Sequence, residues 1–297
     1  MRVFLITAFF IACFWFIPAK AIEVVATIKP LHSLVAGVMG KAGKPTLLLN
    51  GATSPHSYSL RPSDMRKLED ADVVFYISPE LEIFLQRAIK NLPKETTVAA
   101  LVKTEGLETL EVEEEHDAHH HAGTDPHIWM NPQNAILMVS KISDILAQAD
   151  PQNSFMYKEN AENLAKKLLD IDNELREKTA ELKNLPYIVF HDGYRYFEKH
   201  YGLINSGVVT IAPDKQPSAK KLRELREEIT KGNIICLFSE PQHPSSLLKT
   251  ITEGTNINTA ELDPLGADLI AGEEMYFALM NKFADNLEKC LKKRPLL

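Results

Sequence analysis

PQNSFMYKENAENLAKKLLDIDNELREKTAELKNL (residues 151–185) carries apolar residues at alternating spacings of three and four, with one gap at Thr179. This period predicts one long amphipathic helix. About 30 residues at 1.5 Å each span on the order of 45 Å, enough to run the length of a two-lobed protein. A coiled-coil dimer seam is the alternative, but about four heptads beside two α/β lobes more often pack on their own chain. The apolar positions are Tyr157, Ala161, Leu164, Leu168, Ile171, Leu175 and Leu182.

Short apolar runs and amphipathic segments alternate on both sides of this helix. Before it, the pattern predicts strands at 23–28, 46–49 and 73–77, and helices at 31–39, 63–70 and 81–92. After it, strands are expected at 187–190, 208–209, 234–238 and 259–262, with helices from 194, at 218–231 and at 273–291. Strand-helix alternation indicates a parallel sheet covered on both faces. The predicted fold class is therefore α/β, with lobes 22–150 and 186–297 joined by one rigid helix, 151–185.

The N-terminus has the composition of an export signal. Arg2 precedes an apolar run at 3–17, and Ala19-Lys20-Ala21 offers small residues where a signal peptidase cleaves. We expect residues 1–21 to be removed after Ala21 and the mature chain to reach the periplasm. A retained anchor is the first alternative, although the run is short for a membrane helix. Lipidation at Cys13 is the second, although the residues before it form a poor lipobox.

The mature chain is acidic. Losing Arg2 and Lys20 leaves 31 of the 33 basic residues against 40 acidic ones, so the formal charge changes from −7 to −9. An acidic, exported chain is a poor nucleic-acid binder, and we expect no such partner.

Two cysteines, Cys236 and Cys290, remain after cleavage. In an oxidising compartment an even pair predicts a disulfide, here joining the C-terminal helix to a strand. Two buried free thiols are the alternative, and a thiolate contribution to a metal site is a weaker one because neither cysteine has a metal-ligand spacing.

Residues 111–123 form an acidic tract that contains the histidines His116, His119, His120 and His121. Only Val112 is apolar enough to anchor it, so burial cannot offset the entropy of ordering it, and a flexible loop is expected. Acidic and histidine side chains at this density are typical of a weak, multi-site metal trap. A solvated surface loop without that role is the other interpretation.

Three further histidines lie in distinctive segments: His56 in ATSPHSYSLRPSD, His127 in DPHIWMNP and His191 in VFHDGYRYFEKHYGL. Neutral imidazoles suit Zn²⁺, and three of them leave a fourth position open. His191 also ends an apolar strand, where open parallel sheets place ligand groups. The three residues predict one metal site, which only folding can assemble. The remaining histidines His32, His200 and His243 lie outside such segments and are expected to be structural.

With these segments, the chain resembles the periplasmic zinc-binding components of ABC importers, the ZnuA-like branch of the metal-binding solute-binding proteins. The resemblance covers essentially the whole mature chain and includes the acidic histidine loop, FSEPQ at 238–242 and LDPLG at 262–266. It implies two α/β lobes with the metal in the cleft between them. It also implies a monomer that delivers Zn²⁺ to a membrane permease driven by a separate ATPase, and that is not an enzyme.

The resemblance bears on the choice of metal and on the fourth ligand. Relatives that prefer manganese or iron usually carry a carboxylate in place of His191, since carboxylates suit harder ions, so His191 argues for zinc. Asp263 lies where manganese-binding relatives place a carboxylate ligand and is the best fourth candidate, or else a turn residue before Pro264. Some zinc-uptake relatives have a Glu immediately before the first histidine, whereas this chain has Pro55.

Other functions remain as alternatives. A manganese- or iron-binding solute-binding protein is the nearest. A zinc hydrolase would need a general base such as Asp192 or Asp263, and no HExxH motif supports it. A histidine-rich adhesin or a metal buffer would work without a permease. The chain contains no Walker-type phosphate loop, consistent with ATP hydrolysis on another subunit.

Overall fold

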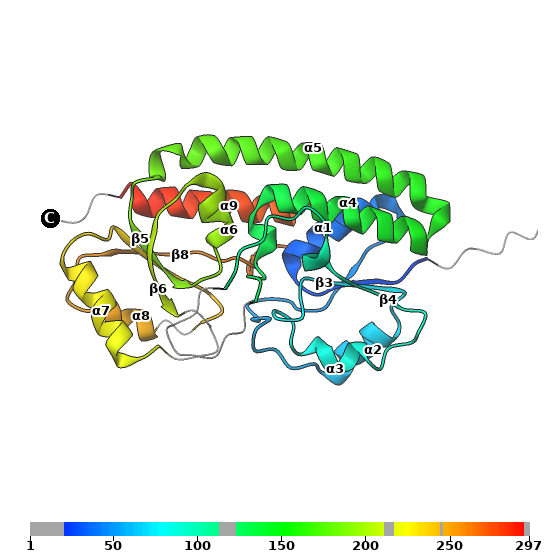
Figure 1. The fold of residues 1–297 in the computed structure, drawn as a ribbon, viewed down its shortest axis with the longest axis horizontal. Helices are drawn as coiled ribbons and strands as arrows, with labels where there is room; N and C mark the ends of the chain where they lie inside the picture. The colour runs from blue at the N-terminus through cyan, green and yellow to red at the C-terminus, as the bar shows by residue number, and fades with distance from the viewer. Residues whose placement is uncertain (1–20, 113–122, 211–216, 244–245, 294–297) are drawn as a thin grey trace, which may run out of the picture.

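The computed structural model describes residues 21–112, 123–210, 217–243 and 246–293 (Figure 1). Within them the chain forms two four-stranded parallel sheets, ordered β2-β1-β3-β4 and β6-β5-β7-β8. The predicted signal peptide, apart from Ala21, lies outside the described residues, as do His116, His119, His120 and His121 of the acidic tract. The predicted α/β fold with two parallel sheets is confirmed.

The first lobe and the long helix contain β1 (Val24–Ala26), α1 (Lys29–Met39), η1 (Gly40–Ala42), β2 (Thr46–Leu47), α2 (Pro62–Glu69), β3 (Val73–Tyr76), α3 (Leu85–Ile89), β4 (Thr97–Ala100), η2 (Leu101–Lys103), η3 (Ile128–Met130), α4 (Pro132–Ala149), η4 (Pro151–Asn153), α5 (Ser154–Thr179) and η5 (Ala180–Leu182). The second lobe contains β5 (Tyr187–His191), α6 (Arg195–Tyr201), β6 (Asn205–Thr210), α7 (Ala219–Thr230), β7 (Cys236–Ser239), α8 (Ser246–Thr252), β8 (Asn258–Glu261) and α9 (Met275–Leu291).

Alternate side chains of each strand enter different cores. In β3, Val73 and Phe75 face the large core shared with α1, α4, α5 and α9, whereas Val74 faces the smaller core beneath α2 and α3. In β5, Val189 faces the shared core and Ile188 faces α7 and α8. Each sheet is thus covered on both faces, as period-two alternation in a parallel sheet requires.

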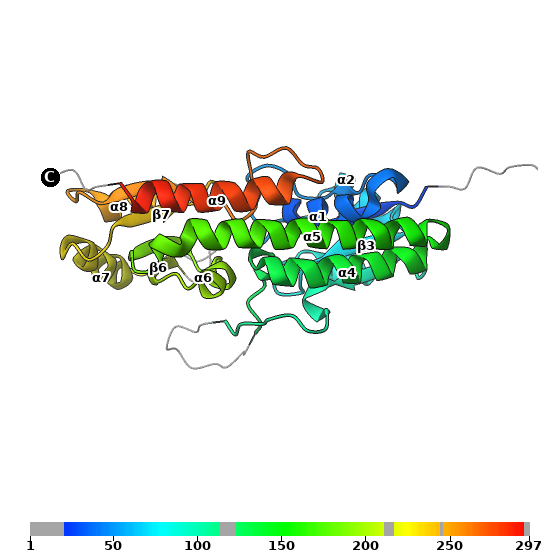
Figure 2. The same ribbon diagram turned by 90° about the horizontal axis from the view of Figure 1, so that it is seen from above.

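The long helix α5 runs over both lobes, and Figure 2 shows it between α4 and α9. Its 26 residues span about 39 Å. All seven apolar positions of the predicted stripe are buried in the shared core. The helix therefore packs its apolar face on its own chain. The helix is shorter than predicted because 3₁₀ turns, η4 and η5, replace its first and last turns.

Several predicted boundaries were wrong. The helix expected at 81–92 shrinks to α3, because the Glu82 carboxylate accepts the backbone N–H groups of Ile77 and Ser78 and holds the preceding residues in a tight turn. Strand β4 and helices α4 and α8 were not predicted from the sequence. Helix α4 carried a recognisable start, since the Asn131 side chain caps it and Pro132 occupies its first position.

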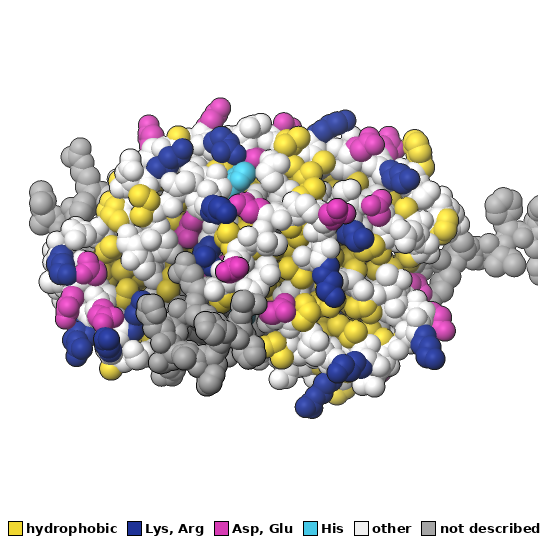
Figure 3. Space-filling model, viewed as in Figure 1, with side chains coloured by type: hydrophobic (Ala, Val, Ile, Leu, Met, Phe, Trp, Pro, Cys, Tyr) yellow, Lys and Arg dark blue, Asp and Glu magenta, His cyan; other side chains and the backbone are white. Residues whose placement is uncertain are grey.

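The surface is polar between apolar patches. The exposed side of α5 carries charged residues such as Glu159, Glu162 and Lys166. Figure 3 shows acidic and basic side chains interspersed with apolar patches over the described part of one face of the molecule. Among the described residues, no helix is both long and apolar enough to cross a membrane.

Cys236 and Cys290 form a disulfide with a Cα–Cα distance of 6.2 Å, which confirms the predicted pairing. The bridge joins β7 to α9, and both residues are buried, with exposed fractions of 0% and 3%. The C-terminal helix is thus tied to the second sheet inside the core.

Replacing both cysteines by alanine is expected to lower the free energy of unfolding. The bridge spans 54 residues, and closing a loop of that length constrains the unfolded chain by about 4 kcal/mol in the chain-entropy model. Urea unfolding followed by circular dichroism would measure the loss. A variant as stable as the oxidised protein would contradict this account.

Asp172 on α5 links three helices. Its carboxylate accepts hydrogen bonds from Gln133 of α4 and from His200 and Tyr201 of α6, at 2.7, 2.7 and 2.9 Å. Burial alone would raise the pKa of Asp172, but the hydrogen bonds from His200 and Gln133 outweigh it and lower the pKa to about 2. His200 therefore has a structural partner, as expected.

The Asp172 network predicts a loss of stability in acid. Because the folded state lowers the pKa of Asp172, its stabilising contribution is present above the ordinary Asp pKa near 4 and disappears as the pH falls toward 2. After allowance for solvent screening the contribution is about 1–2 kcal/mol. The free energies of unfolding of the wild type and Asp172→Asn, measured from pH 7 to pH 2, should approach each other between about pH 4 and pH 2. Parallel curves would refute the assignment.

Candidate metal centre

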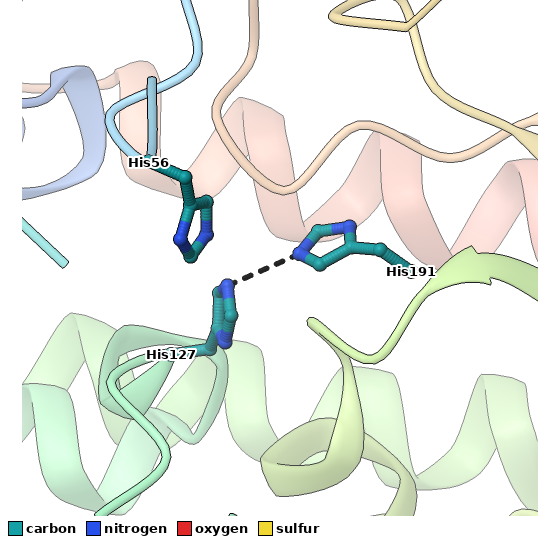
Figure 4. A group of neighbouring side chains, drawn as sticks. All are labelled: His56, His127 and His191. Atoms are coloured by element: carbon teal, nitrogen blue, oxygen red, sulfur yellow. Dashed lines mark hydrogen bonds between the residues drawn. The ribbon is translucent and has the colours of Figure 1, made fainter. Parts of the chain in front are cut away.

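Three distant segments bring their histidines together between the lobes. His56 lies in the loop between β2 and α2, His127 immediately precedes η3, and His191 is the last residue of β5. Their ring centroids lie 5.1 to 5.8 Å apart, and one nitrogen from each falls within 4.8 Å of the others. Figure 4 shows the three rings pointing toward one another.

The backbone beside His191 leaves room for this convergence. A Cβ at Gly193 would lie 2.5 Å from the His191 ring and 3.3 Å from Nε2 of His127. Any side chain at position 193 would push the rings apart, so glycine is needed there for close approach rather than for an unusual φ.

His127 and His191 each donate a hydrogen bond from Nδ1 to a carboxylate. Asp125 Oδ1 accepts both the backbone N–H and Nδ1 of His127, at 3.0 and 2.8 Å. Glu240 Oε1 accepts Nδ1 of His191 at 2.5 Å and the hydroxyl of Tyr194 at 2.6 Å. An ionised carboxylate can only accept, so the proton of each neutral ring lies on Nδ1 and its Nε2 presents a lone pair.

The two Nε2 atoms face each other at 3.2 Å (Figure 4). Two lone pairs cannot form a hydrogen bond, so the pair must share a proton or bind a cation. Two nitrogens bound to one tetrahedral Zn²⁺ are roughly 3.3 Å apart. The observed spacing therefore suits a zinc ion as it stands.

Burial and nearby charges shift the pKa values of His56 and His191 in opposite directions. Burial lowers the pKa of His56 well below its usual value, and the neighbouring rings of His127 and His191 add to the effect. Burial would also lower the pKa of His191, but the Glu240 carboxylate outweighs it and raises that pKa. His56 is thus held as a neutral nitrogen donor.

The pocket draws its walls from both lobes. The first lobe supplies Pro55 and Trp129 beside His56 and His127, and the second supplies Leu265 and the other half of the lining. Glu240, Gln242 and His243 belong to that half. His243, which the sequence analysis expected to be structural, thus lines the pocket, and Glu240 was not predicted. Both lie in or beside the FSEPQ segment, and Glu240 follows the end of β7 next to β5, so the strand-end rule that selected His191 could have found it.

Asp263 has partners of its own. Its Oδ1 accepts from Gln242 Nε2 at 2.8 Å and from the backbone N–H of Leu265 at 2.9 Å, and its Oδ2 accepts the N–H of Ala267. A turn residue makes such contacts. A role as fourth ligand stays a prediction, and it would require these hydrogen bonds to break.

Lys29 of α1 connects the lobes near the site. Its Nζ donates to the carbonyl oxygens of Gly266, Ala267 and Leu269, at 2.8 to 2.9 Å. These residues follow β8 in the second lobe. Burial lowers the pKa of Lys29, against the opposing attraction of nearby aspartates. The Lys29 ammonium group therefore links the loop after β8, in the second lobe, to α1 in the first lobe.

Lys29→Met should lower the free energy of unfolding by about 2–4 kcal/mol, because three partly buried carbonyl groups lose a charged donor. Amide hydrogen exchange in residues 264–270 should accelerate as well. Lys41→Met, at an exposed site in η1 directly after α1, serves as the matched control and should change stability by less than about 0.5 kcal/mol. Equal effects of the two substitutions would contradict the role of Lys29.

Comparison with known proteins bears on this site. The family described as "Zinc-uptake complex component A periplasmic" matches residues 24–290. The high-affinity zinc uptake system protein ZnuA of Brucella suis is 36% identical over 306 residues, covering 91% of this chain and 92% of that protein. The protein of the same name from Paracoccus denitrificans is 34% identical, covering 93% and 94%.

Solved structures share the fold. A crystal structure of ZnuA has a TM-score of 0.80 at 22% identity, covering 92% of this chain and 100% of that one. FpvC from Pseudomonas aeruginosa in complex with Mn²⁺ has a TM-score of 0.80 at 20% identity, covering 92% and 99%. Zn(II)-bound AdcA from Streptococcus pneumoniae has a TM-score of 0.73 at 26% identity, covering 93% and 59%. With a family match over residues 24–290 of its 297, the protein belongs to the periplasmic component A family of zinc-uptake complexes.

Proposed function

We propose that this protein captures Zn²⁺ in the periplasm and delivers it to an ABC-type membrane permease driven by a separate ATPase subunit. His56, His127 and His191 are the proposed ligands, and the ion is cargo rather than a catalytic cofactor. Family membership supports periplasmic zinc uptake. The names of the similar proteins from Brucella suis and Paracoccus denitrificans support high affinity.

One observation carries the ligand assignment. The Nε2 atoms of His127 and His191 converge at 3.2 Å while carboxylates hold the protons on the opposite sides of both rings. Carboxylate-histidine pairs of this kind orient metal ligands and increase their basicity. His56 adds a third nitrogen, held neutral by burial.

The donor set, rather than the fold, favours zinc. FpvC has a similar fold in complex with Mn²⁺, so a manganese- or iron-binding function is the second candidate. Three imidazoles favour zinc over these harder ions. Water or Asp263 would complete the tetrahedron.

We also infer that the protein performs no hydrolysis. A zinc hydrolase needs a carboxylate free to take a proton from the bound water. Asp263 is engaged in a turn, Asp192 lies 3.6 Å from Arg195, and Asp125 and Glu240 hold the rings of His127 and His191. A transport role needs no such base.

The mature protein is proposed to begin at Ile22 and to act as a monomer with lobes 22–150 and 186–297. The histidine tract is proposed to collect ions for the cleft. Its ends are paired, because Glu111 bridges Thr124 and Val112 N–H donates to Gly123 at 2.9 Å. Residues 113–122 can therefore be replaced by an Asn-Gly hairpin turn without disturbing the flanking chain.

Zinc titration by calorimetry tests this proposal. Three proteins are compared: the mature chain, the Asn-Gly loop replacement and the double variant His127→Ala/His191→Ala. One tight site is expected to persist in the loop replacement and to disappear from the double variant. Tight binding that survives in the double variant would move the site away from the cleft.

A further inference from the structure

The second lobe carries a ligand set of its own beside the three histidines. His191, Glu240 and His243 each place one donor atom within 4.8 Å of the other two. His191 and Glu240 are nearly inaccessible, at 3% and 4% exposed, and His243 is half-buried. His191 ends β5, and Glu240 and His243 follow the neighbouring strand β7, whereas His56 and His127 come from the first lobe.

The spacing between Glu240 and His243 suits a metal better than a hydrogen bond, whereas Glu240 Oε1 accepts a hydrogen bond from His191 Nδ1. Glu240 Oε2 and His243 Nε2 lie 3.6 Å apart, which is too long for a good hydrogen bond. Two donors on one tetrahedral zinc ion are separated by roughly 3.3–3.5 Å. A small movement of the His243 ring would bring both atoms onto one ion.

Packing holds the His243 ring toward the site. It stacks on Phe190 with ring centroids 4.6 Å apart and planes 14° apart, and its centroid lies 6.1 Å from that of His191. Phe190 immediately precedes His191 on β5. The same strand thus positions one ligand directly and the other through an aromatic contact.

We propose that His191, Glu240 and His243 form a second position for a divalent transition metal, alternative to the three-histidine position and contained within the second lobe. The proposal rests on the proposed function. His191 belongs to both sets, so one ion occupies one position at a time. In the second position the ion replaces the proton that His191 Nδ1 donates to Glu240, and that proton moves to Nε2, so His56 and His127 no longer hold the ion. Three protein ligands leave a coordination position open, from which the ion can be released.

Variants that remove the first-lobe ligands test the proposal. In the Asn-Gly loop replacement, His56→Ala/His127→Ala should still bind one Co²⁺ or Zn²⁺, roughly 100-fold or more weakly than the loop-replaced parent. Adding His243→Phe, which preserves the stack on Phe190, should weaken that residual binding by roughly tenfold or more and change the visible absorption spectrum of bound Co²⁺. Adding His200→Gln instead should change neither.

The outcomes separate this inference from the proposed function. If the loop-replaced parent fails to bind zinc tightly, the proposed function itself fails. If the parent binds tightly but the His56→Ala/His127→Ala variant binds nothing, or binds equally well with His243→Phe, the second position does not exist. Thermal melts followed by circular dichroism establish that each variant is folded.

Discussion

His191→Ala is expected to weaken zinc binding by roughly 10²–10³-fold. Structural zinc sites with four ligands contribute about 10–16 kcal/mol, or on the order of 3 kcal/mol for each ligand. We expect His191 to matter more than an average ligand, because its Nε2 lies 3.2 Å from Nε2 of His127 and its Nδ1 donates a hydrogen bond to the buried Glu240. Competition against a chromophoric chelator at pH 7.5 would measure the change in dissociation constant.

His200→Gln provides the comparison for this result. Its side chain can still donate to Asp172, and it lies outside the pocket lining, so zinc affinity should remain within about twofold of the wild type. If His191→Ala also remained within that range, the ion would be held elsewhere. His191→Glu offers a second comparison, because a carboxylate there should shift relative affinity from zinc toward manganese.

The fold was predictable where periodicity was strong. The apolar stripe of α5 and the buried runs of β1, β3, β5 and β7 each satisfied a simple repeat. Helix α4 was not predicted although its cap at Asn131 was readable, because that cap lies inside DPHIWMNP, a segment assigned to the metal site. The helix expected at 81–92 is shorter in the structure for a reason that local helix propensity does not contain. The buried Glu82 carboxylate accepts hydrogen bonds from backbone N–H groups of the preceding turn.

The convergence of His56, His127 and His191 was predictable from the sequence. The carboxylates that accept hydrogen bonds from their rings were not. Each candidate histidine lay in a segment with turn formers or at a strand end, which are local signals. Glu240 meets His191 across 49 residues of sequence, and only the adjacency of β5 and β7 brings them together. His243 was dismissed because its contacts, with Phe190 and Glu240, also depend on that pairing. Motif spacing therefore does not reveal residues that contact a candidate ligand only in the folded chain.

The supporting carboxylates also explain why the cleft needs a cation. Each places a negative charge behind a ring and exposes a lone pair in front. Without an ion, the two Nε2 atoms of His127 and His191, 3.2 Å apart, must share a proton. In the proposed site zinc would replace this proton, and the Glu240 carboxylate of the second lobe would neutralise part of the ion's charge. Affinity is therefore shared between the ligands and the groups that orient them.

Asp125→Asn is expected to weaken zinc binding by roughly 10–100-fold although Asp125 does not touch the ion, because it is the group that orients His127. Its Oδ1 accepts both Nδ1 and the backbone N–H of His127, while its buried Oδ2 has no hydrogen-bond partner among the described residues. The amide retains the shape of the side chain but loses the charge. Its NH₂ group, turned toward the ring, would place the imidazole proton on Nε2, where it blocks the metal.

Nitrogen-15 NMR of the imidazole rings distinguishes this orienting role from a general loss of structure. In the metal-free wild type, the His127 proton should lie on Nδ1, and in Asp125→Asn a substantial fraction should move to Nε2. The melting temperature should fall only modestly, since the backbone turn can keep one acceptor. A large loss of affinity with an unchanged His127 tautomer would mean that Asp125 acts through its charge alone. Unchanged affinity would show that His127 binds zinc without this support, and the convergence of the rings would then depend on Glu240 and Gly193.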